Sequence, residues 1–338
     1  DSPPSFEPIF PLSPDIKTEP VSMHEMYQAI RRLKTGKAPG PDGTTAELFK
    51  ILDDELLEIV LTNINNIWQS EVLPPEMFQA NLAVIYKKGS TQEPSNYRPI
   101  ALLNLTYKIL AIIIHNRLSG PLDDKINPHQ FGFRRAKSTT QPLFIYRRIQ
   151  ELHEESGDTF HTLLLDWEKA FDKVDQDRLV QALARLGIPP KIFRIIAAIY
   201  ATPAFTVTEG TNNSTERQQR AGIRQGCPLS PYLFILLLTI VSHDANNKHK
   251  TLTQERTLAE GQPHGTDVGE LYYADDTLIM ARTPHAAQIT LRNIESESNK
   301  YNLKHNIAKC IHIQMNDNHR IRYNNGGFVP IATQATYL

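Results

Sequence analysis

Three aspartates stand at positions where a carboxylate adds little to the stability of a fold. Asp166 follows the apolar run 161–165, and Asp275 and Asp276 lie between two apolar runs much later in the chain. If these side chains meet, they repel one another, and burying them is costly unless a cation lies between them. Two divalent ions about 3.5–4 Å apart would neutralise them, activate a hydroxyl and hold a triphosphate. Oxygen ligands favour Mg²⁺, with Mn²⁺ as a substitute.

Each acid also has a plainer interpretation. Asp is common in turns because its side chain hydrogen-bonds the nearby backbone, which would explain Asp275 and Asp276. Asp166 alone is typical of a residue that ends a strand. The order and context of all three acids together favour a metal site.

The surrounding pattern predicts the elements that would position these acids. Residues 161–165 read as a strand, and 271–273 and 277–280 read as two strands joined by a tight hairpin at 274–276. Helical spacing predicts helices near 22–33, 103–118, 140–155, 176–186 and 284–301. It also predicts one long helix over 45–68, with Leu48, Leu52, Leu56 and Ile59 facing inward. Hairpins mixed with helices indicate an α+β fold.

Charge is unevenly distributed along a chain whose formal net charge is only −1. From Lys87 to Arg148 there are eleven Lys and Arg against three acids, a net of +8. From Glu151 to Asp177 there are nine acids against two Lys, a net of −7. A phosphate-binding surface beside a metal site would have this pattern, and so would ordinary solvated surface.

The remaining bulk features exclude some classes of protein. The two cysteines are too few for a disulfide framework or a zinc site, which predicts an intracellular protein. The apolar run 232–241 is too short to span a bilayer, so no membrane partner is expected. Residues 1–20 contain six prolines and read as an extended linker. The first residue is not Met, so we expect a piece of a longer protein.

Three blocks resemble polymerase motifs A, B and C of reverse transcriptases: LDWEKAFD at 165–172, GIRQGCPLSP at 222–231 and YYADD at 272–276. Three further blocks are similar to the non-LTR (LINE-type) retrotransposon branch of that family: GKAPGPDG at 36–43, NYRPI at 96–100 and QFGFR at 130–134. The resemblance runs from about residue 30 to the end of the chain, in the order of the family.

The resemblance implies a right-hand polymerase with fingers and palm. It implies a Pro-rich linker over 1–20, an N-terminal extension with basic fingers over 21–160, and a palm with motifs A, B and C and the start of the D/E region over 161–338. The palm would be an antiparallel sheet with helices on one face. Family members continue into a helical thumb, which is expected to be missing here because the chain ends at Leu338.

The activity implied is that of an RNA-directed DNA polymerase, a nucleotidyltransferase that adds dNTPs to a DNA primer 3′-hydroxyl on an RNA template. It would act within a retrotransposon polyprotein, in the nucleus. By resemblance, Asp166, Asp275 and Asp276 are the catalytic residues and metal ligands, and the Trp167 carbonyl is a further ligand. Adjacent residues of an extended chain point to opposite sides, so Asp276 joins Asp275 at the metals only if the turn redirects one of the two side chains.

The resemblance also implies binding residues. Phe171, five residues after Asp166, would lie under the sugar of the nucleotide and exclude a 2′-hydroxyl, although a core aromatic is the plainer reading. The other nucleotide-binding candidates are Gln225, Gly226, Arg98, Lys87, Lys88 and Lys309. Stacking rings combined with cations suit a template strand, for which the candidates are Phe131, Phe133, Arg134, Arg135 and Lys137.

Two alternatives stay open. A group II intron-type reverse transcriptase shares motifs A to C, although the block at 36–43 favours the non-LTR branch. A polymerase domain that has lost catalysis could serve as a nucleic-acid-binding scaffold, although such domains tend to lose their carboxylates. A viral RNA polymerase is disfavoured by Phe171. The sequence leaves the oligomeric state open.

Overall fold

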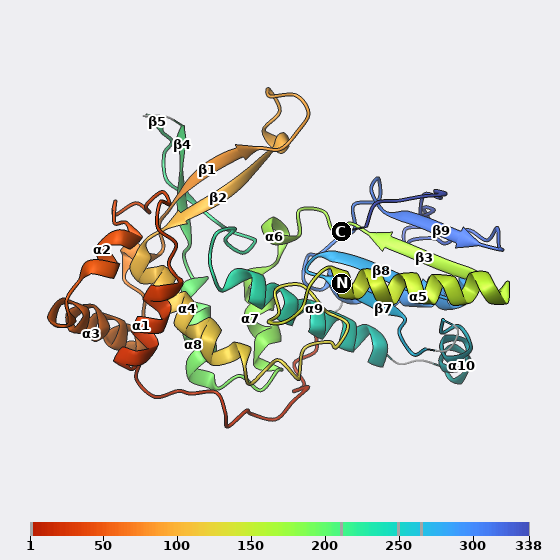
Figure 1. Cartoon of the computed structure of the whole chain (residues 1–338), viewed down its shortest axis with the longest axis horizontal. Helices are drawn as coiled ribbons and strands as arrows, with labels where there is room; N and C mark the ends of the chain where they lie inside the picture. The colour runs from red at the N-terminus through yellow and green to blue at the C-terminus, as the bar shows by residue number, and fades with distance from the viewer. Residues whose placement is uncertain (1–2, 210–211, 249–250, 264–265, 338) are drawn as a thin grey trace. The chain divides into compact units, whose positions relative to one another are not determined.

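The computed structural model describes residues 3–337 apart from 210–211, 249–250 and 264–265 (Figure 1). The chain forms two compact units. Unit one holds residues 1–5, 123–174 and 234–338, and unit two holds 6–122 and 175–233. The two units divide the chain at other positions than the boundary expected near residue 160: residues 123–160 fold with unit one and 175–233 with unit two. Helix α9 (Ser230–Asn247) carries the chain from unit two into unit one.

Unit one is built on a four-stranded sheet. Its elements are α5 (Thr140–Ser156), β3 (Phe160–Leu165), α6 (Ala170–Lys173), α10 (Leu252–Glu260), β7 (Glu270–Tyr273), β8 (Asp276–Ala281), α11 (Pro284–Asn299) and β9 (Ile311–Met315). The strand order is β7-β8-β3-β9, and every pairing is antiparallel. The α+β class and the antiparallel sheet are confirmed.

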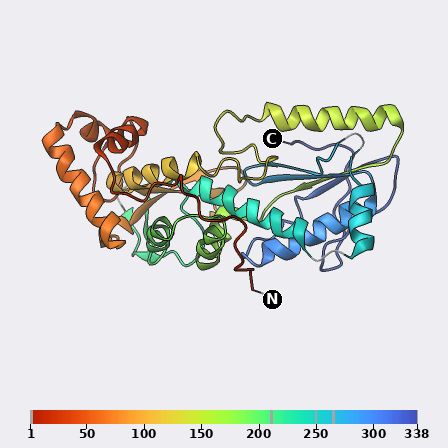
Figure 2. The ribbon, with the colours of Figure 1, turned by 90° about the horizontal axis from the view of Figure 1, so that it is seen from below.

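Helices cover both faces of this sheet, not one as expected. Figure 2 shows α5 on one side of the strands and α11 on the other. Both faces are apolar, since all residues of β8 after Asp276 are buried, as are nearly all residues of β3. On the α5 side a core cluster forms from Phe131, Ile149, Phe160, Leu271, Leu278 and Met280. A strand that is apolar at consecutive positions needs cover on both faces, and this signal was present in the sequence.

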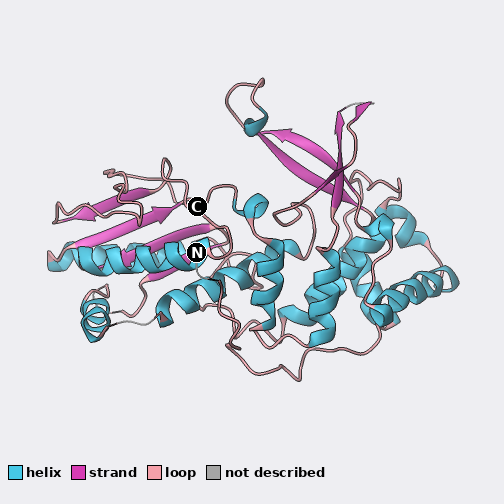
Figure 3. Cartoon of the chain, turned by 180° about the vertical axis from the view of Figure 1, so that it is seen from behind, coloured by secondary structure: helices cyan, strands magenta, loops and turns pink. Residues whose placement is uncertain are grey.

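Unit two is rich in helices and has a five-stranded sheet (Figure 3). Its elements are α1 (Met23–Arg32), α2 (Ala46–Ile51), α3 (Asp54–Ser70), η1 (Pro75–Met77), β1 (Ala80–Tyr86), η2 (Pro94–Asn96), β2 (Tyr97–Leu103), α4 (Leu105–Ser119), α7 (Gln176–Ala184), α8 (Pro190–Ile199), β4 (Ala204–Glu209), β5 (Asn212–Asn213) and β6 (Arg217–Gln218). Strand β1 pairs antiparallel with β2 and parallel with β4. Helix α4 is buried on nearly all sides, as its apolar sequence requires. None of the helices within the described residues is both long and apolar enough to cross a membrane.

The single helix expected over 45–68 is two helices. The Asp53 side chain accepts a hydrogen bond from the Leu56 backbone N–H and caps α3, so the first helix ends before it. Of the residues expected to face inward, Leu48, Leu56 and Ile59 are exposed. Because the helix is interrupted, α3 buries a different face from the one expected. Its buried side chains are Leu57, Ile64, Ile67 and Trp68.

The Pro-rich N-terminal segment is extended, but it is hydrogen-bonded to other parts of unit two and is not a free linker. The Ile9 and Phe10 backbone N–H groups both donate to the Arg185 carbonyl, at 2.8 and 3.1 Å, and Ser13 N donates to the Gly187 carbonyl at 2.8 Å. Gly187 has to be glycine here, since a Cβ would lie 1.9 Å from the Pro11 carbonyl oxygen. These bonds fasten residues 9–13 to unit two.

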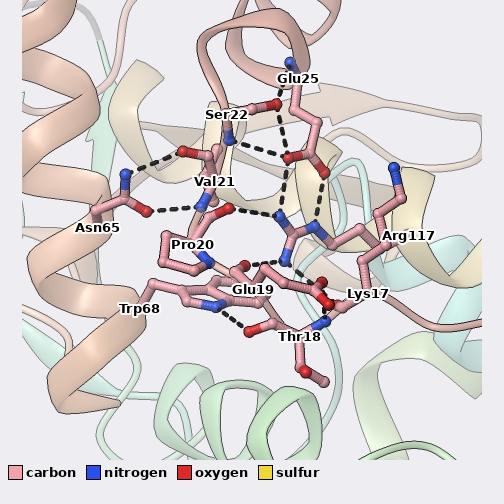
Figure 4. A network of polar contacts seen from close by, with 10 residues as sticks. All are labelled: Lys17, Thr18, Glu19, Pro20, Val21, Ser22, Glu25, Asn65, Trp68 and Arg117. Atoms are coloured by element: carbon pink, nitrogen blue, oxygen red, sulfur yellow. Dashed lines mark hydrogen bonds and ion pairs between the residues drawn. The ribbon is translucent and has the colours of Figure 1, made fainter. Parts of the chain in front are cut away.

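Arg117, on α4, holds the next part of this segment (Figure 4). Its side chain is 3% exposed and makes a two-pronged ion pair with Glu25, at 2.7 and 2.8 Å. It also donates to the carbonyls of Lys17, Glu19 and Pro20 and lies 4.5 Å from the centre of the Trp68 ring. Burial raises the pKa of Glu25, but the bonds from Arg117 and Ser22 outweigh it, and the pKa falls from 4.5 to about 2. The pair therefore stabilises the fold at neutral pH and is lost as the pH falls from about 4.5 towards 2.

We expect Arg117→Met to destabilise the protein by about 3–5 kcal/mol, because it leaves a half-buried carboxylate and three backbone carbonyls without their donor. The free energy of unfolding from urea titration checks this. Arg148→Met is the control: Arg148 pairs with Glu151 on the exposed surface of α5, where a pair contributes about 1 kcal/mol or less. Equal losses in the two variants would contradict the role given to Arg117.

Candidate active site

The β7–β8 hairpin carries Asp275 and Asp276 at its tip. Tyr273 pairs with Asp276, so the turn between the strands consists of only Ala274 and Asp275. Ala274 has φ +57°, a conformation that costs a non-glycine residue free energy. The tight hairpin expected from the sequence is confirmed, and its strained residue immediately precedes Asp275.

Strand β3 brings Asp166 to the same end of the sheet. Leu165 pairs with Thr277 on β8, so the same register places Asp166 opposite Asp276. The backbone of Asp166 is held on both sides: its carbonyl accepts from Asn306 N at 2.7 Å, and its N–H donates to the Cys310 sulfur at 3.4 Å. Unit one thus brings the three predicted acids together.

The charges of these acids act on one another. The pKa of Asp276 rises from 3.8 to about 6, first because of burial and then because of the negative charges of Asp275 and Asp166. One carboxylate oxygen of Asp166 is buried without a hydrogen bond and lies 3.4 Å from Lys309 Nζ. Mutual repulsion and a buried carboxylate oxygen without a hydrogen bond are what a divalent cation would relieve.

The carboxylate oxygens of the three acids are suitable ligands for such an ion, although they do not surround a metal position on all sides. Among the described residues, no group of three or more Asp, Glu, His or Cys side chains is gathered closely enough to hold a metal. Carboxylates that leave coordination positions for substrate oxygens are the usual way in which proteins hold Mg²⁺ at a triphosphate.

The Trp167 side chain packs against Thr277 and His305. The indole is buried, its N–H donates to Thr277 Oγ1 at 3.0 Å, and its ring lies 4.3 Å from that of His305. Burial lowers the pKa of His305 to about 4, so this imidazole is neutral at physiological pH. The role of the Trp167 carbonyl as a metal ligand stays a prediction. The contacts of Thr277 and His305 with Trp167, and of Cys310 with Asp166, were not predicted, since only the tertiary packing creates them.

Two of the five predicted template residues have structural roles instead. Phe131 is 5% exposed and belongs to the core cluster on the α5 side, so its ring is covered. The Arg134 side chain is 7% exposed and binds both carboxylate oxygens of Asp123 at 3.0 Å. It also donates to the carbonyls of Asp123, Asn127 and Gln130. With its guanidinium used within unit one, Arg134 is not available to a phosphate.

The other three template candidates lie on the surface. Phe133 and Arg135 are exposed, and Lys137 is partly exposed with its Nζ 5.5 Å from the centre of the Phe131 ring. These three residues differ from Phe131 and Arg134 in their exposure to solvent, which residue type alone does not predict.

The predicted nucleotide-binding residues belong to both units. In unit one, Phe171 on α6 is partly exposed and stacks on Phe234 at 4.8 Å, and Lys309 lies beside Asp166. In unit two, Lys87, Lys88 and Arg98 are exposed near one end of the β1–β2 hairpin.

Gly226 lies against β2 in unit two. Its φ is +114°, and a Cβ would lie 2.5 Å from the Ala101 carbonyl oxygen, so the close approach requires glycine. The backbone carbonyl of its neighbour Gln225 accepts from Ala101 N at 2.6 Å. These contacts fix the turn that carries both residues.

Unit two also contains a basic pocket of about 410 Å³. Arg32, Lys34, Lys37 and Lys108 line it together with Gly226. The pocket unites two blocks that are distant in the sequence, 36–43 and 222–231. Burial lowers the pKa of Lys108, an effect that the charge of Asp42 opposes. Sequence reasoning missed this pocket, because its cations come from separate segments.

Comparisons with known proteins identify a family and several relatives of this chain. The family described as "Reverse transcriptase (RNA-dependent DNA polymerase)" matches residues 85–328. The chain is 31% identical to the "Transposon TX1 uncharacterized 149 kDa protein" of Xenopus laevis, over 65% of this chain and 17% of that protein. It is 27% identical to the "RNA-directed DNA polymerase from mobile element jockey" of Drosophila funebris, over 90% of this chain and 32% of that protein.

A third relative, the "Retrovirus-related Pol polyprotein from type-1 retrotransposable element R2" of Popillia japonica, is 29% identical over 65% of this chain and 30% of its own length. The chain thus spans a third or less of each of these three relatives. The family match covers most of the chain and includes Asp166, Asp275 and Asp276. The chain belongs to the reverse transcriptase (RNA-dependent DNA polymerase) family, with relatives among the non-LTR retrotransposons.

Proposed function

We propose that this chain is the polymerase part of a non-LTR retrotransposon protein and adds dNTPs to a DNA primer on an RNA template. The observation that carries the proposal is the meeting of Asp166 with the Asp275-Asp276 turn at one end of the unit-one sheet. In this proposal unit one is the palm and unit two contains the fingers. Nuclear location stays a prediction.

Asp166 and Asp275 would hold two Mg²⁺ ions, which supply charge neutralisation and activation of the primer hydroxyl when bound. The chain itself supplies orientation and further positive charge. Lys309, next to Asp166, would face a phosphate of the nucleotide, and Phe171, braced by Phe234, would lie under the sugar. In unit two, the exposed cations of the β1–β2 hairpin and the basic pocket support binding of phosphates.

The scaffold alternative is disfavoured by the energetics of the site. Burial and the charges of Asp275 and Asp166 raise the pKa of Asp276, which shows that this grouping of carboxylates destabilises a fold that does not use them. A scaffold could lose these carboxylates at no cost. The group II intron-type alternative is disfavoured by the relatives, which come from TX1, jockey and R2 elements.

We expect Asp275→Asn to lose at least about 100-fold of primer extension, because it removes a charge that holds the metal at the reacting phosphate. Extension of a DNA primer on an RNA template with Mg²⁺ and dNTPs measures this, and circular dichroism checks that the variant is folded. Asp124→Asn, a change at an exposed aspartate of unit one, should extend normally. Full activity of Asp275→Asn would refute the site, whereas a wild type that is folded and binds RNA but never extends would favour the scaffold.

We expect Phe171→Ala to admit ribonucleotides, because it removes the flat ring that would clash with a 2′-hydroxyl. The ratio of kcat/KM for dNTP over rNTP should fall by at least about tenfold, equivalent to about 1.4 kcal/mol. Phe144→Ala, which removes an exposed ring from α5, serves as the control. An unchanged ratio in Phe171→Ala would remove its role in sugar selection.

We expect Arg135→Met to weaken RNA binding without changing stability, and Arg134→Met to lower the melting temperature. The two arginines are neighbours, but only Arg134 is buried in hydrogen bonds. Titration of labelled RNA at several salt concentrations measures the first effect, and a lost phosphate contact should reduce the slope of log affinity against log salt by about one. Loss of RNA affinity in folded Arg134→Met but not in Arg135→Met would contradict this assignment.

A further inference from the structure

A short segment of chain lies along the edge of β7, beside the turn that carries Asp275. Phe131 N donates to the Tyr272 carbonyl at 2.8 Å, and Tyr272 N donates to the His129 carbonyl at 2.9 Å, so Gln130 bridges to Tyr272 in parallel. The segment 129–132 therefore acts as an extra piece of strand next to the catalytic hairpin. Its close approach requires Gly132, because a Cβ there would lie 2.1 Å from Ala274 N.

The Gln130 side chain binds this turn directly. It is 1% exposed, and its Oε1 accepts from Ala274 N at 2.9 Å and from Gly132 N at 2.8 Å. Its Nε2 donates to the Ala274 carbonyl at 3.2 Å. A neutral amide can make this whole set of bonds, since it presents an acceptor to two N–H groups and a donor to a carbonyl.

The turn needs such a partner. Ala274 has a positive φ, and as a turn residue it lies beyond the last pair of the β7–β8 ladder, Tyr273 with Asp276. Gln130 binds both the N–H and the carbonyl of Ala274, and so fixes the peptide planes on either side of it. The second of these planes leads into Asp275, whose own carbonyl accepts from Thr277 Oγ1 at 3.3 Å. Asp275 is thus held from both sides.

We propose that Gln130 is a positioning residue: by clamping the backbone of Ala274, it aims the Asp275 carboxylate at the metal ion and sets the affinity of the site for that ion. The inference rests on the proposed function for the identity of the ligand. It gives the block at 130–134 a different use from template binding, since Gln130, Phe131, Gly132 and Arg134 all face the interior of unit one. Residues that orient metal ligands typically contribute 10–100-fold to metal affinity.

The test uses Gln130→Met, which keeps the length of the side chain and removes all three hydrogen bonds. Binding of Mn²⁺, followed by electron paramagnetic resonance, should weaken by at least about tenfold. The Mg²⁺ concentration for half-maximal primer extension should rise to a similar extent. Amide hydrogen exchange at Ala274, measured without metal, should accelerate. Ile149→Val is the control, because Ile149 lies in the core cluster that contains Phe131, the neighbour of Gln130, and the change lowers stability without touching the turn.

A double-mutant comparison separates positioning from general destabilisation. In the Asp275→Asn background, Gln130→Met should weaken Mn²⁺ binding no further, because the carboxylate that it aims is gone. An equal loss in both backgrounds, or an equal loss in Ile149→Val, would overturn the inference, as would a wild type that binds no Mn²⁺. If the wild type binds Mn²⁺ but does not extend a primer, the proposed function fails while the affinity of Gln130→Met still decides the role of the clamp.

Discussion

The repulsion among Asp166, Asp275 and Asp276 is the constraint around which unit one is organised. Burial, and then the charges of Asp275 and Asp166, raise the pKa of Asp276 to about 6, so bringing the three acids together opposes folding. The sheet supplies the compensating stability, because its strands are apolar on both faces and are covered by α5 on one side and α11 on the other. A core of this kind stabilises the fold mainly through the apolar area that it buries. This stability outweighs the repulsion among the acids at one end of the sheet.

The supports around the acids are mostly backbone contacts made by uncharged groups. Thr277 accepts from the Trp167 indole and donates to the Asp275 carbonyl, while Asn306 and Cys310 hold the backbone of Asp166. Uncharged partners fix the geometry without neutralising the carboxylates. Lys309 lies beside Asp166, and its side chain is exposed.

Unit two meets a different requirement, since it must hold an N-terminal segment that forms no helix or strand over residues 3–22. Arg117 does so from a buried helix by binding Glu25 and three backbone carbonyls at once. Buried polar groups are stable only when they are satisfied, and here the segment supplies acceptors that the guanidinium would otherwise lack. The segment read as a linker is therefore part of the fold.

Residue types and their order were sufficient to predict the α+β class and the tight hairpin, because strand periodicity and turn chemistry are local, and the family resemblance implied the antiparallel sheet. The catalytic role of the three acids stays a prediction. Residue types and their order were also sufficient to identify the family. Tertiary structure alone decided that Arg134 is a structural residue whereas its neighbour Arg135 is exposed, and that Phe131 is core. It decided the division into units and the contact of Gln130 with Ala274 as well. Burial and hydrogen bonding depend on segments far apart in the chain, and no local pattern encodes which of two identical side chains will be covered.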